Sequence, residues 1–452
     1  MIVVANRLPV SWDGDQWVTS PGGLVRALRP VLQNAEGAWV GWPGIPDLDP
    51  PPFLHDGIYQ KPVALSEEEV DSFYYGFCNG TLWPLYHDAI VAPEFHRHTW
   101  KPYIEVNQRY ADETAEVVNP GDIAWVQDYQ LQLVPAMLRR KVPDLTIGFY
   151  LHIPFPPIEV FARLPWRKQI IEGLLGADVI AFQTRQSADN FARAARRIAG
   201  AEAIGRRDLR WNGRPVHLQP APIAIDTAEF ERMAQSEPVQ QRAAEIRAEL
   251  GDPECVILGM DRLDYTKGID FRLKAFAGLL EDAAKDRHQY GFVQVAVPSR
   301  EQVPAYQQLR SDIEQLVGRI NGDYGDPGWT PVSYLYRTLP FEEVIALYVA
   351  ADVMLVTPLR DGMNLVAKEY AACRLEDTGV LILSEFAGAA EQLKAALIVN
   401  PYDVNSVTAT LEYAASMPIP EQKRRMRRLR REVRRSDVFG WARDCLAILE
   451  DV

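Results

Sequence analysis

Short apolar runs rich in β-branched residues alternate along the chain with longer amphipathic stretches. Eight of these runs predict strands, at residues 2–5, 123–126, 146–151, 179–182, 256–260, 292–297, 353–357 and 380–383. Runs that are apolar on both faces are typical of strands buried in parallel sheets. Because the runs alternate with helical patterns, we predict an α/β fold.

The length of the chain predicts two domains. Its 452 residues exceed what one hydrophobic core usually supports, so we expect two domains of about 200 residues each. The boundary falls in the run QPAPIAID at 219–226, which a long polar helical stretch at 228–250 follows. We predict two doubly wound, Rossmann-like domains, at 1–222 and 223–436, that face each other across a cleft.

Polar side chains follow the predicted strands in both halves. In open α/β sheets, ligands bind at the carboxyl ends of the strands. Seven charged or titratable residues stand there: Arg7, Asp128, His152, Arg262, Arg300, Asp361 and Glu385. Their recurrence predicts a cleft lined by charge.

The charge balance narrows the partners of the protein. The chain has 48 Lys and Arg against 61 Asp and Glu, a net charge of −13. An acidic chain gains nothing from counterion release on DNA, so we expect no nucleic-acid partner. Anionic substrates can bind only where basic residues are locally concentrated. We see no apolar span of membrane length and no signal-peptide pattern, so we expect a cytoplasmic protein with no membrane partner.

Cysteine and histidine spacing indicates no metal centre. The four cysteines, Cys78, Cys255, Cys373 and Cys445, are far apart and form no CxxC pair, which is typical of reduced thiols. His96 and His98 form an HxH pair without an evident third ligand. We therefore expect no metal.

The motif RLDYTKG places Arg262 and Lys267 five residues apart, directly after a predicted strand. Two cations at this point would stabilise the charge on a diphosphate leaving group without a metal ion. The alternative, that the two are surface charges and one is bridged to Asp264, stays open on spacing alone.

The run TPLRDGMNLVAKEY at 357–370 is the most specific local motif. Asp361 and Gly362 form a turn, and the amides of 362–364 would face an anion at a helix start. Glu369 lies about two helical turns beyond Asp361 and would suit ribose hydroxyls, whereas Asp361 would suit sugar hydroxyls. The alternative is a helix cap at Asp361 followed by an exposed glutamate.

Three further features allow both a structural and a functional interpretation. Gly22 and Gly23 precede a helical pattern, where their amides could approach an anion, although the motif is neither GxGxxG nor a Walker loop. His152 precedes a proline-rich turn and could be a core histidine. The aromatic cluster that includes Tyr74 and Trp83 could form core or flank a sugar ring.

Several long motifs together carry a family resemblance. They are VANRLP, SPGGL, LWPLYH, WVQDYQLQLVP, YLHIPFPP, RLDYTKG, NGDYGDPGWTP, RDGMNLVAKEY and SEFAGAAEQL, in this order. The chain resembles, over essentially its whole length, the retaining trehalose-6-phosphate synthases, which are glucosyltransferases of the GT-B fold. The motifs are most similar to those of bacterial, particularly actinobacterial, members.

The resemblance implies a role for each matching position. The donor would be bound in the C-terminal domain and at one loop of the N-terminal domain, by Gly22, Gly23, Arg262, Lys267, Leu339, Asp361, Gly362, Met363, Asn364, Leu365, Val366 and Glu369. The acceptor would be bound by Arg7, Tyr74, Trp83, Asp128 and Arg300, and Trp83 and His152 match positions tied to anomer selection. The implied catalytic set is Asp128, His152, Arg262, Lys267 and Asp361. The last helix, within 437–452, would cross back to the N-terminal domain.

The implied reaction moves glucose from a nucleoside diphosphate glucose to glucose 6-phosphate, with retention, and gives α,α-trehalose 6-phosphate. No cofactor and no metal are implied. UDP-glucose is the default donor, with GDP-glucose and ADP-glucose open, and we expect a homo-oligomer. Two alternatives stay open: another phosphorylated acceptor, such as glycerol 3-phosphate or a cyclitol amine phosphate, and a catalytically silent sugar-phosphate sensor. The presence of Arg7, Trp83 and Arg300 argues against the first, and that of Arg262 and Lys267 against the second.

Overall fold

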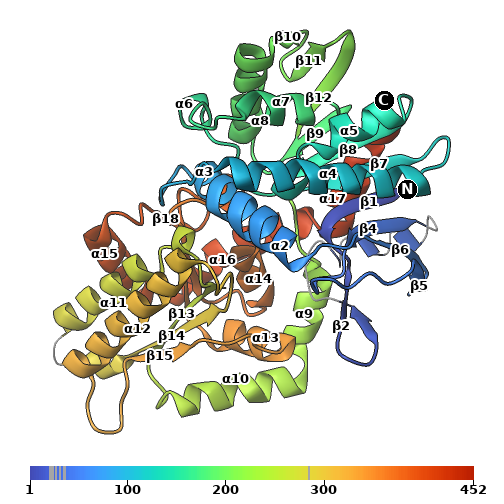
Figure 1. Ribbon diagram of the computed structural model, residues 1–452. Coiled ribbons are helices and arrows are strands. Elements are labelled where there is room, and N and C mark those ends of the chain that lie inside the picture. The colour runs from blue at the N-terminus through green and yellow to red at the C-terminus, as the bar shows by residue number, and fades with distance from the viewer. Residues whose placement is uncertain (20–24, 26–27, 30–31, 34–36, 284–285, 452) are drawn as a thin grey trace. The chain divides into compact units, whose positions relative to one another are not determined.

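A computed structural model describes residues 1–451, apart from 20–24, 26–27, 30–31, 34–36 and 284–285 (Figure 1). The chain forms two compact units. The first consists of Met1–Ile223 with Val438–Val452, and the second of Ala224–Asp437. Each unit is therefore a separate body with its own sheet.

The first unit is built on a ten-stranded sheet with the order β10-β11-β12-β9-β8-β7-β1-β4-β6-β5. The strands are β1 (Ile2–Arg7), β4 (Ala38–Trp42), β5 (Phe53–His55), β6 (Ile58–Pro62), β7 (Ile123–Gln127), β8 (Thr146–Leu151), β9 (Val179–Phe182), β10 (Glu202–Ala203), β11 (Asp208–Trp211) and β12 (Arg214–Pro220). The central strands pair in parallel, whereas β5, β10 and β11 pair antiparallel at the edges. A separate hairpin joins β2 (Val10–Trp12) and β3 (Trp17–Thr19).

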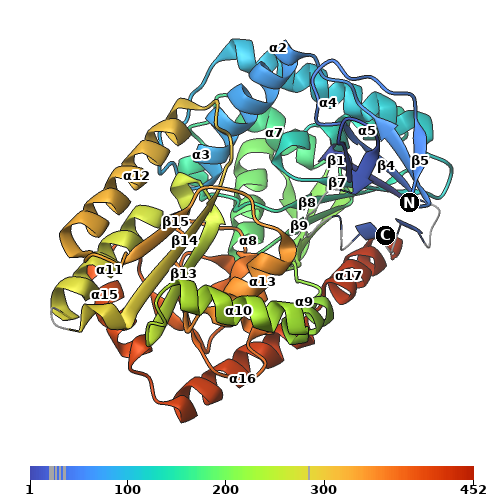
Figure 2. The same cartoon turned by 90° about the horizontal axis from the view of Figure 1, so that it is seen from below.

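Helices cover both faces of this sheet. They are α2 (Glu67–Glu69), the π-helix η1 (Val70–Leu82), α3 (Trp83–Tyr86), α4 (Arg97–Val117), α5 (Val134–Lys141), α6 (Ile158–Phe161), α7 (Arg167–Leu174), α8 (Arg185–Ala194), the π-helix η3 (Ala195–Ala199) and α17 (Val438–Glu450). Figure 2 shows α4 and α5 on one side of the strands and α17 on the other. The C-terminal helix thus belongs to the first unit.

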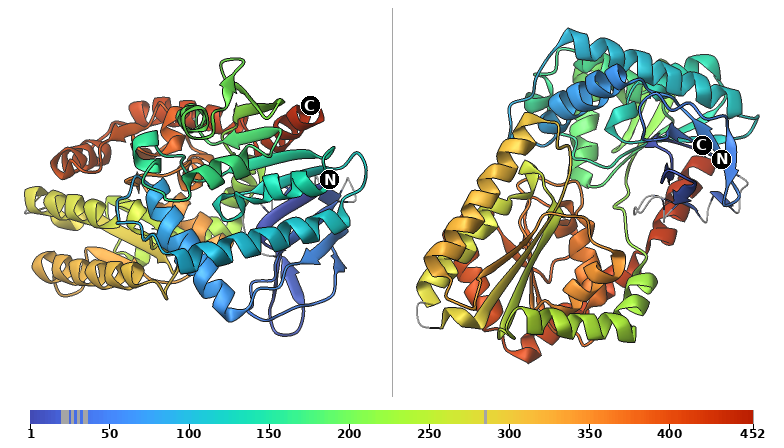
Figure 3. Two further views of the ribbon diagram at one scale, coloured as in Figure 1. Left: turned by 45° about the horizontal axis from the view of Figure 1, so that its top comes forward. Right: turned by 60° about the horizontal axis from the view of Figure 1, so that its bottom comes forward.

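The second unit is built on a six-stranded sheet in which every pair is parallel. Its order is β15 (Val332–Leu335), β14 (Tyr290–Val297), β13 (Cys255–Arg262), β16 (Val353–Val356), β17 (Val380–Ser384) and β18 (Leu397–Val399). The helices are α9 (Thr227–Gln235), α10 (Glu237–Glu249), α11 (Ile269–Ala283), α12 (Pro304–Tyr324), α13 (Phe341–Ala350), α14 (Leu365–Cys373), α15 (Val404–Ala415) and α16 (Ile419–Arg435). Figures 2 and 3 show α11 and α12 on one face and α10 and α13 on the other.

Both sheets reverse their strand order at one point. The chain builds the first sheet outward from β1, to β4 on one side and to β7 on the other, and the second outward from β13, to β14 and to β16. At such a reversal the loops after the two central strands diverge and leave a crevice at their carboxyl ends. The reversal points therefore lie between β1 and β7 and between β13 and β16.

The predicted α/β fold with doubly wound sheets is confirmed, and each of the eight predicted strands forms. One predicted helix is wrong. The stretch 228–250 is two helices, because Ser236 is extended, with φ −67° and ψ 140°, and α10 begins one residue later with Pro238 in its first turn. Proline has no N–H for a continuing helix, and its ring would clash with the carbonyl of the preceding turn.

Among the described residues no helix combines the length and the apolar character that crossing a bilayer requires.

Candidate active site

Lys267 and Asp361 meet at the reversal point of the second sheet. Lys267 follows β13 on the short 3-10 helix Tyr265–Lys267, and Asp361 follows β16. Lys267 Nζ lies 2.5 Å from Asp361 Oδ2, and both side chains are largely buried, at 11% and 14% exposure. Asn364 Nδ2 donates to the same oxygen at 3.2 Å. The structure therefore brings together three of the predicted donor residues.

A tight turn holds Lys267 in this position. Gly268 has φ +60°, and a Cβ on it would lie 2.3 Å from the Thr357 carbonyl oxygen. The backbone N–H of Leu359 donates to the Thr266 carbonyl at 2.7 Å. The segments that follow β13 and β16 are thus tied together, and only glycine combines this φ with so close an approach.

Beneath the turn lies Arg272, a residue that the sequence analysis missed. It is fully buried and donates to Asp261 Oδ2 at 2.5 Å, to the Lys267 carbonyl at 2.9 Å and to the Leu355 carbonyl at 3.1 Å. Burial raises the pKa of Asp261, against the opposing charge of Arg272. The guanidinium therefore links β13, β16 and the Lys267 turn from below. An arginine among the buried residues Ile269, Leu273 and Phe276 of α11 was the available signal.

The loop after Asp361 ends in a cap that differs from the predicted alternative. The residue that caps α14 is Asn364, not Asp361: its Oδ1 accepts from the N–H of Ala367 at 3.1 Å, and its φ is +81°. Gly362, Met363 and Asn364 are buried, whereas Leu365 and Val366 are partly exposed. The N–H of Ala389 donates to the Met363 carbonyl at 2.7 Å, so the segment after β17 supports this loop.

Glu369 and Leu339 are two further predicted donor residues that the structure describes. Glu369 Oε2 accepts a hydrogen bond from Tyr348 Oη at 2.7 Å. Burial and the Glu369 charge hold the pKa of Tyr348 well above its usual value, so the phenol remains a donor. Leu339 lies between β15 and α13 and is partly buried. The structure thus orients Glu369 through a buried tyrosine.

Arg262 and Arg300 occupy different settings. Arg262 is the last residue of β13, and its side chain is exposed. Arg300 is buried, and its Nη1 lies 2.6 Å from Asp264 Oδ2. Tyr306 Oη donates to the same oxygen at 2.8 Å. Asp264 and Tyr306, neither of which was predicted as a functional residue, therefore fix the arginine.

Arg7, Asp128 and His152 lie at the carboxyl ends of the neighbouring strands β1, β7 and β8. Arg7 ends β1, and its guanidinium lies 4.8 Å from the ring centre of Trp42. Asp128 follows β7 and donates from its N–H to the Tyr150 carbonyl at 2.7 Å. The N–H of His152, after β8, donates to Asp128 Oδ1 at 3.1 Å. The loops after β7 and β8 are thus joined through the Asp128 carboxylate.

His152 is held as a neutral ring. Its Nε2 lies 3.0 Å from Gln127 Oε1, and Gln183 Nε2 lies 3.4 Å from its Nδ1. Burial lowers the pKa of His152 to about 3. Because an amide oxygen faces Nε2, that nitrogen carries the proton and Nδ1 accepts. Both ring nitrogens therefore have neutral partners, which suits orientation of a ligand better than proton transfer.

The predicted acceptor aromatics stand beside Asp128. Trp83 is buried, and its ring centre lies 5.7 Å from that of Tyr129, the residue after Asp128. Tyr129 Oη donates to Asn79 Oδ1 at 3.0 Å, and Asn79 Nδ2 donates to the Tyr74 carbonyl at 2.7 Å. Tyr74 and Asn79 lie on the π-helix η1, a rare element that is frequent at functional sites.

Three of the predicted residues have left-handed backbone. Asp128, Arg300 and Asn364 have φ of +70°, +50° and +81°. A residue other than glycine in this region stores about 1–3 kcal/mol, and such residues cluster at active sites. Seven other described residues, among them Asp47, Asp252 and Asp377, also have positive φ, so this strain accompanies the site loops without distinguishing them.

Some predicted features fall elsewhere. Gly22 and Gly23 lie outside the described residues. Arg300 belongs to the second unit, whereas the other four predicted acceptor residues belong to the first. In the described part of the chain no group of three or more His, Cys, Asp or Glu side chains is placed to hold a metal ion. Cys78, Cys255, Cys373 and Cys445 are free and buried.

Comparison with known proteins places these features in one family. The model of glycosyltransferase family 20 matches residues 1–451. A trehalose-6-phosphate synthase of Mycolicibacterium paratuberculosis is 53% identical over 467 residues, which cover 100% of this chain and 95% of the relative. One of Mycolicibacterium smegmatis is 52% identical over 99% of this chain and 92% of the relative.

Solved structures match over the same extent. A UDP-forming α,α-trehalose-phosphate synthase from Burkholderia xenovorans is similar with a TM-score of 0.92 and 35% identity, over 100% of this chain and 98% of that one. A structure from the same organism in complex with glucose 6-phosphate has a TM-score of 0.91 and 33% identity, over 99% of both chains. An E. coli structure bound with UDP-2-fluoro glucose has a TM-score of 0.93 and 34% identity, over 100% and 99%.

Proposed function

The protein belongs to glycosyltransferase family 20 and has the GT-B fold, and from this premise we propose its reaction. It transfers glucose from a nucleoside diphosphate glucose to the anomeric hydroxyl of glucose 6-phosphate. The products are α,α-trehalose 6-phosphate and the nucleoside diphosphate. The observation that carries the proposal is the Lys267–Asp361 pair at the reversal point of the second sheet, beside the buried loop 362–364.

The donor half of the site lies in the second unit. Lys267 and Arg262 hold the diphosphate. Arg262 ends β13 and Lys267 lies on the 3-10 helix that follows this strand, and charge-assisted contacts to phosphate are strong. Asp361 and the loop from Gly362 to Val366 receive the glucose. Glu369, oriented by Tyr348, accepts from the ribose hydroxyls. Gly22, Gly23 and the backbone at Leu339 complete the donor contacts.

Four of the five proposed acceptor residues belong to the first unit, and Arg300 belongs to the second. Asp128 accepts from acceptor hydroxyls, and Tyr74 and Trp83 flank the sugar. Arg7 and Arg300 recognise the 6-phosphate, for which the planar fork of a guanidinium is suited. The glucose 6-phosphate complex of the Burkholderia xenovorans relative supports this substrate.

The chemistry that we propose is the displacement that the family resemblance implies. The bond from the donor anomeric carbon to the diphosphate breaks, and the acceptor oxygen bonds to the same face of that carbon. The acceptor proton passes to the departing phosphate, through an oxocarbenium-like state. Lys267 and Arg262 stabilise the charge that develops on the diphosphate, without a metal or cofactor. His152 is neutral and serves orientation, together with Trp83.

One assay tests the proposal. The protein is incubated with UDP-, GDP- or ADP-glucose and, in turn, with glucose 6-phosphate, glycerol 3-phosphate or a cyclitol amine phosphate. EDTA is present, and nucleotide release and the anomeric configuration of the product are measured. We expect release that depends on glucose 6-phosphate, strongest with UDP-glucose, and an α,α-linked product. Release only with glycerol 3-phosphate or a cyclitol amine phosphate would establish another acceptor, and no release with any pair would contradict the proposed transferase activity.

We also propose that the protein is a cytoplasmic homo-oligomer. Size-exclusion chromatography with light scattering tests the assembly, and a mass equal to one chain would contradict it.

A further inference from the structure

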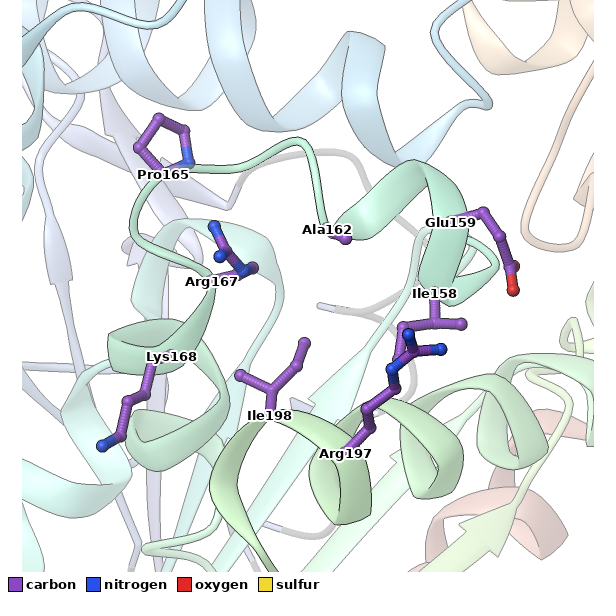
Figure 4. A pocket seen from close by; sticks show the side chains of 8 residues that line it. All are labelled: Ile158, Glu159, Ala162, Pro165, Arg167, Lys168, Arg197 and Ile198. Atoms are coloured by element: carbon purple, nitrogen blue, oxygen red, sulfur yellow. The ribbon is translucent and has the colours of Figure 1, made fainter.

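The first unit holds a pocket that no residue of the proposed active site lines. Its volume is about 520 Å³, within the range of sites for small molecules. Figure 4 shows the lining residues, which come from α6, from the connection to α7 with the start of that helix, and from η3. They are Ile158, Glu159, Ala162, Pro165, Arg167, Lys168, Arg197 and Ile198.

The charge of the pocket opposes that of the chain. Three lining residues are basic and one is acidic, whereas the whole chain carries a net charge of −13. Exposed Arg163, Arg193 and Arg196 stand in the same elements or beside them. In an acidic protein, such a local concentration of cations marks a place where an anion can bind.

The two guanidinium groups of the pocket have donors left for a ligand. Arg197 makes no hydrogen bond and no ion pair with any residue that the structure describes. Arg167 donates one hydrogen bond, from Nη1 to the Leu164 carbonyl at 3.2 Å. Figure 4 shows the two groups on opposite sides of Ile198, with the Glu159 carboxylate at the outer edge. A guanidinium has five N–H donors, so both can contact a ligand.

The start of α7 places cations where the helix dipole disfavours them. Arg167 and Lys168 are the first two residues of the helix, and its first turn contains no acidic residue. The nearest carboxylate to Lys168 is that of Glu172, 3.8 Å from its Nζ. A helix N-terminus carries partial positive charge, so these cations raise the local potential further. A bound anion would neutralise both.

We propose that this pocket binds a phosphate monoester of a small metabolite. A dianionic phosphate group offers the oxygens that Arg167 and Arg197 can contact in pairs, and Lys168 adds a third charge. Ile158, Ile198 and Pro165 provide apolar surface for the carbon part of the ligand. The pocket is thus a second phosphate site, apart from the residues that bind donor and acceptor.

Hydrogen exchange with mass spectrometry tests the pocket because it reports each segment separately. The probes are phenyl phosphate, inorganic phosphate and the uncharged phenol, each titrated into the full chain. We expect phenyl phosphate to slow exchange in peptides covering 158–170 and 193–200. Its dissociation constant should be at least threefold lower than that of inorganic phosphate, because the ring gains apolar contact. Phenol should give no protection.

Variants separate the pocket from the active site. In Arg167→Ala/Arg197→Ala the dissociation constant read from these peptides should rise at least tenfold. Arg210→Ala, on the exposed edge of β11, is the matched control and should change it less than twofold. Both substituted arginines are exposed, so the thermal unfolding midpoint should not change. If the double variant is unstable, Arg197→Gln replaces it, with a rise of at least threefold.

Three results would overturn the proposal. They are no protection of these peptides at millimolar phenyl phosphate, equal protection by phenol, and an unchanged dissociation constant in the arginine variant.

Discussion

Lys267 and Asp361 form a close charge pair, with 2.5 Å between Nζ and Oδ2. In the proposed reaction the donor diphosphate replaces the carboxylate as the partner of Lys267, while sugar hydroxyls approach Asp361. The lysine thus keeps a partner in both states. Its charge is needed most when the bond to the diphosphate breaks.

The first prediction is that Lys267→Ala lowers turnover by several orders of magnitude and leaves the fold intact. The loss arises because one of two cations on the leaving group is removed. Steady-state nucleotide release measures turnover, and circular dichroism measures the fold. Lys274→Ala, an exposed residue paired with Asp270 at 2.8 Å, is the control and should retain full activity. Near-normal turnover of Lys267→Ala would refute the assigned role.

The second prediction concerns the positioning of Arg300 by Tyr306. Tyr306→Phe removes the hydroxyl that donates to Asp264 at 2.8 Å. A hydrogen bond to a charged group contributes about 1.5–3 kcal/mol, so we expect KM for glucose 6-phosphate to rise about 10–100-fold, with kcat within twofold. Tyr336→Phe removes an exposed hydrogen bond to Glu301 and is the matched control. An unchanged KM in Tyr306→Phe would show that Arg300 does not depend on it.

The third prediction concerns acid stability. The pKa of His152 is about 3 in the folded chain and near 6.5 when unfolded, so the unfolded chain binds more protons between these values. The stability from the neutral ring is complete above pH 6.5 and falls as the pH drops toward 3. At pH 5 the loss is up to about 2 kcal/mol. Urea unfolding at pH 7 and pH 5 should show a larger loss for wild type than for His152→Asn. Equal losses would mean that His152 titrates normally.

At the scale of elements, the turns after β13 and β16 decide where the site forms. Gly268, at φ +60° and with no room for a Cβ, lets the two segments lie against each other. Arg272 bonds to both from below. The site is therefore held by the connections of the two central strands.

The fourth prediction compares two glycine substitutions. Gly268→Ala should destabilise the chain by more than about 1 kcal/mol and lower turnover, because its Cβ would meet the Thr357 carbonyl at 2.3 Å. Gly318→Ala, inside α12 with nothing within 4 Å, should stabilise by about 0.5–1 kcal/mol with unchanged turnover. Denaturant unfolding and the transferase assay measure both. The turn model fails if Gly268→Ala behaves like Gly318→Ala.

The strands could be predicted because their hydrophobic pattern indicates that both faces are buried. Runs such as 256–260 and 353–356 are apolar at every position, which only a strand covered on both faces explains. The residues that follow these strands were predicted to be functional because they are charged or titratable and stand at the carboxyl ends of the strands. The structure brings Lys267 to Asp361 and Asp128 to His152.

The supporting residues could not be predicted because their roles depend on distant partners. Asp264 bonds to Arg300, 36 residues away, and Arg272 bonds to Leu355, 83 residues away. The apolar neighbours of Arg272 on α11 indicate that it is buried, but they do not show which residues it contacts. The cap of α14 is Asn364 and not Asp361, because the left-handed backbone of Asn364 places the helix start three residues after Asp361. The break between α9 and α10 at Ser236 has a signal in the sequence, because Pro238 follows two residues later.

At the scale of the whole molecule, the chain crosses twice between its units, after Ile223 and after Asp437. The second crossing brings α17 to the first sheet. Trp441 is buried there, donates from Nε1 to the Ala221 carbonyl at 3.0 Å, and has its ring centre 5.6 Å from that of Trp125. The last helix is thus part of the core of the first unit.

The fifth prediction is that Trp441→Ala destabilises the first unit by about 3–5 kcal/mol, the usual cost of truncating a buried aromatic residue. Native-state hydrogen exchange should show faster opening of amides in 1–223 than in 224–437. Tyr413→Ala, 48% exposed on α15, is the control and should leave both rates nearly unchanged. Equal acceleration in the two units would show that α17 does not belong to the first alone.

The position of α17 also sets the order in which a nascent chain can be completed. When the ribosome has released the residues through Ile223, the strands of the first sheet exist, but the helix that contacts Trp125 and Tyr150 has not been translated. A methyl group at Gly148 would lie 2.8 Å from Leu449, so this face of β8 is shaped for a partner that arrives last. All residues of the second unit are translated before those of α17. The first unit is therefore translated first but completed after the second unit. A chain whose translation stops before α17 carries an uncovered apolar face on the first sheet.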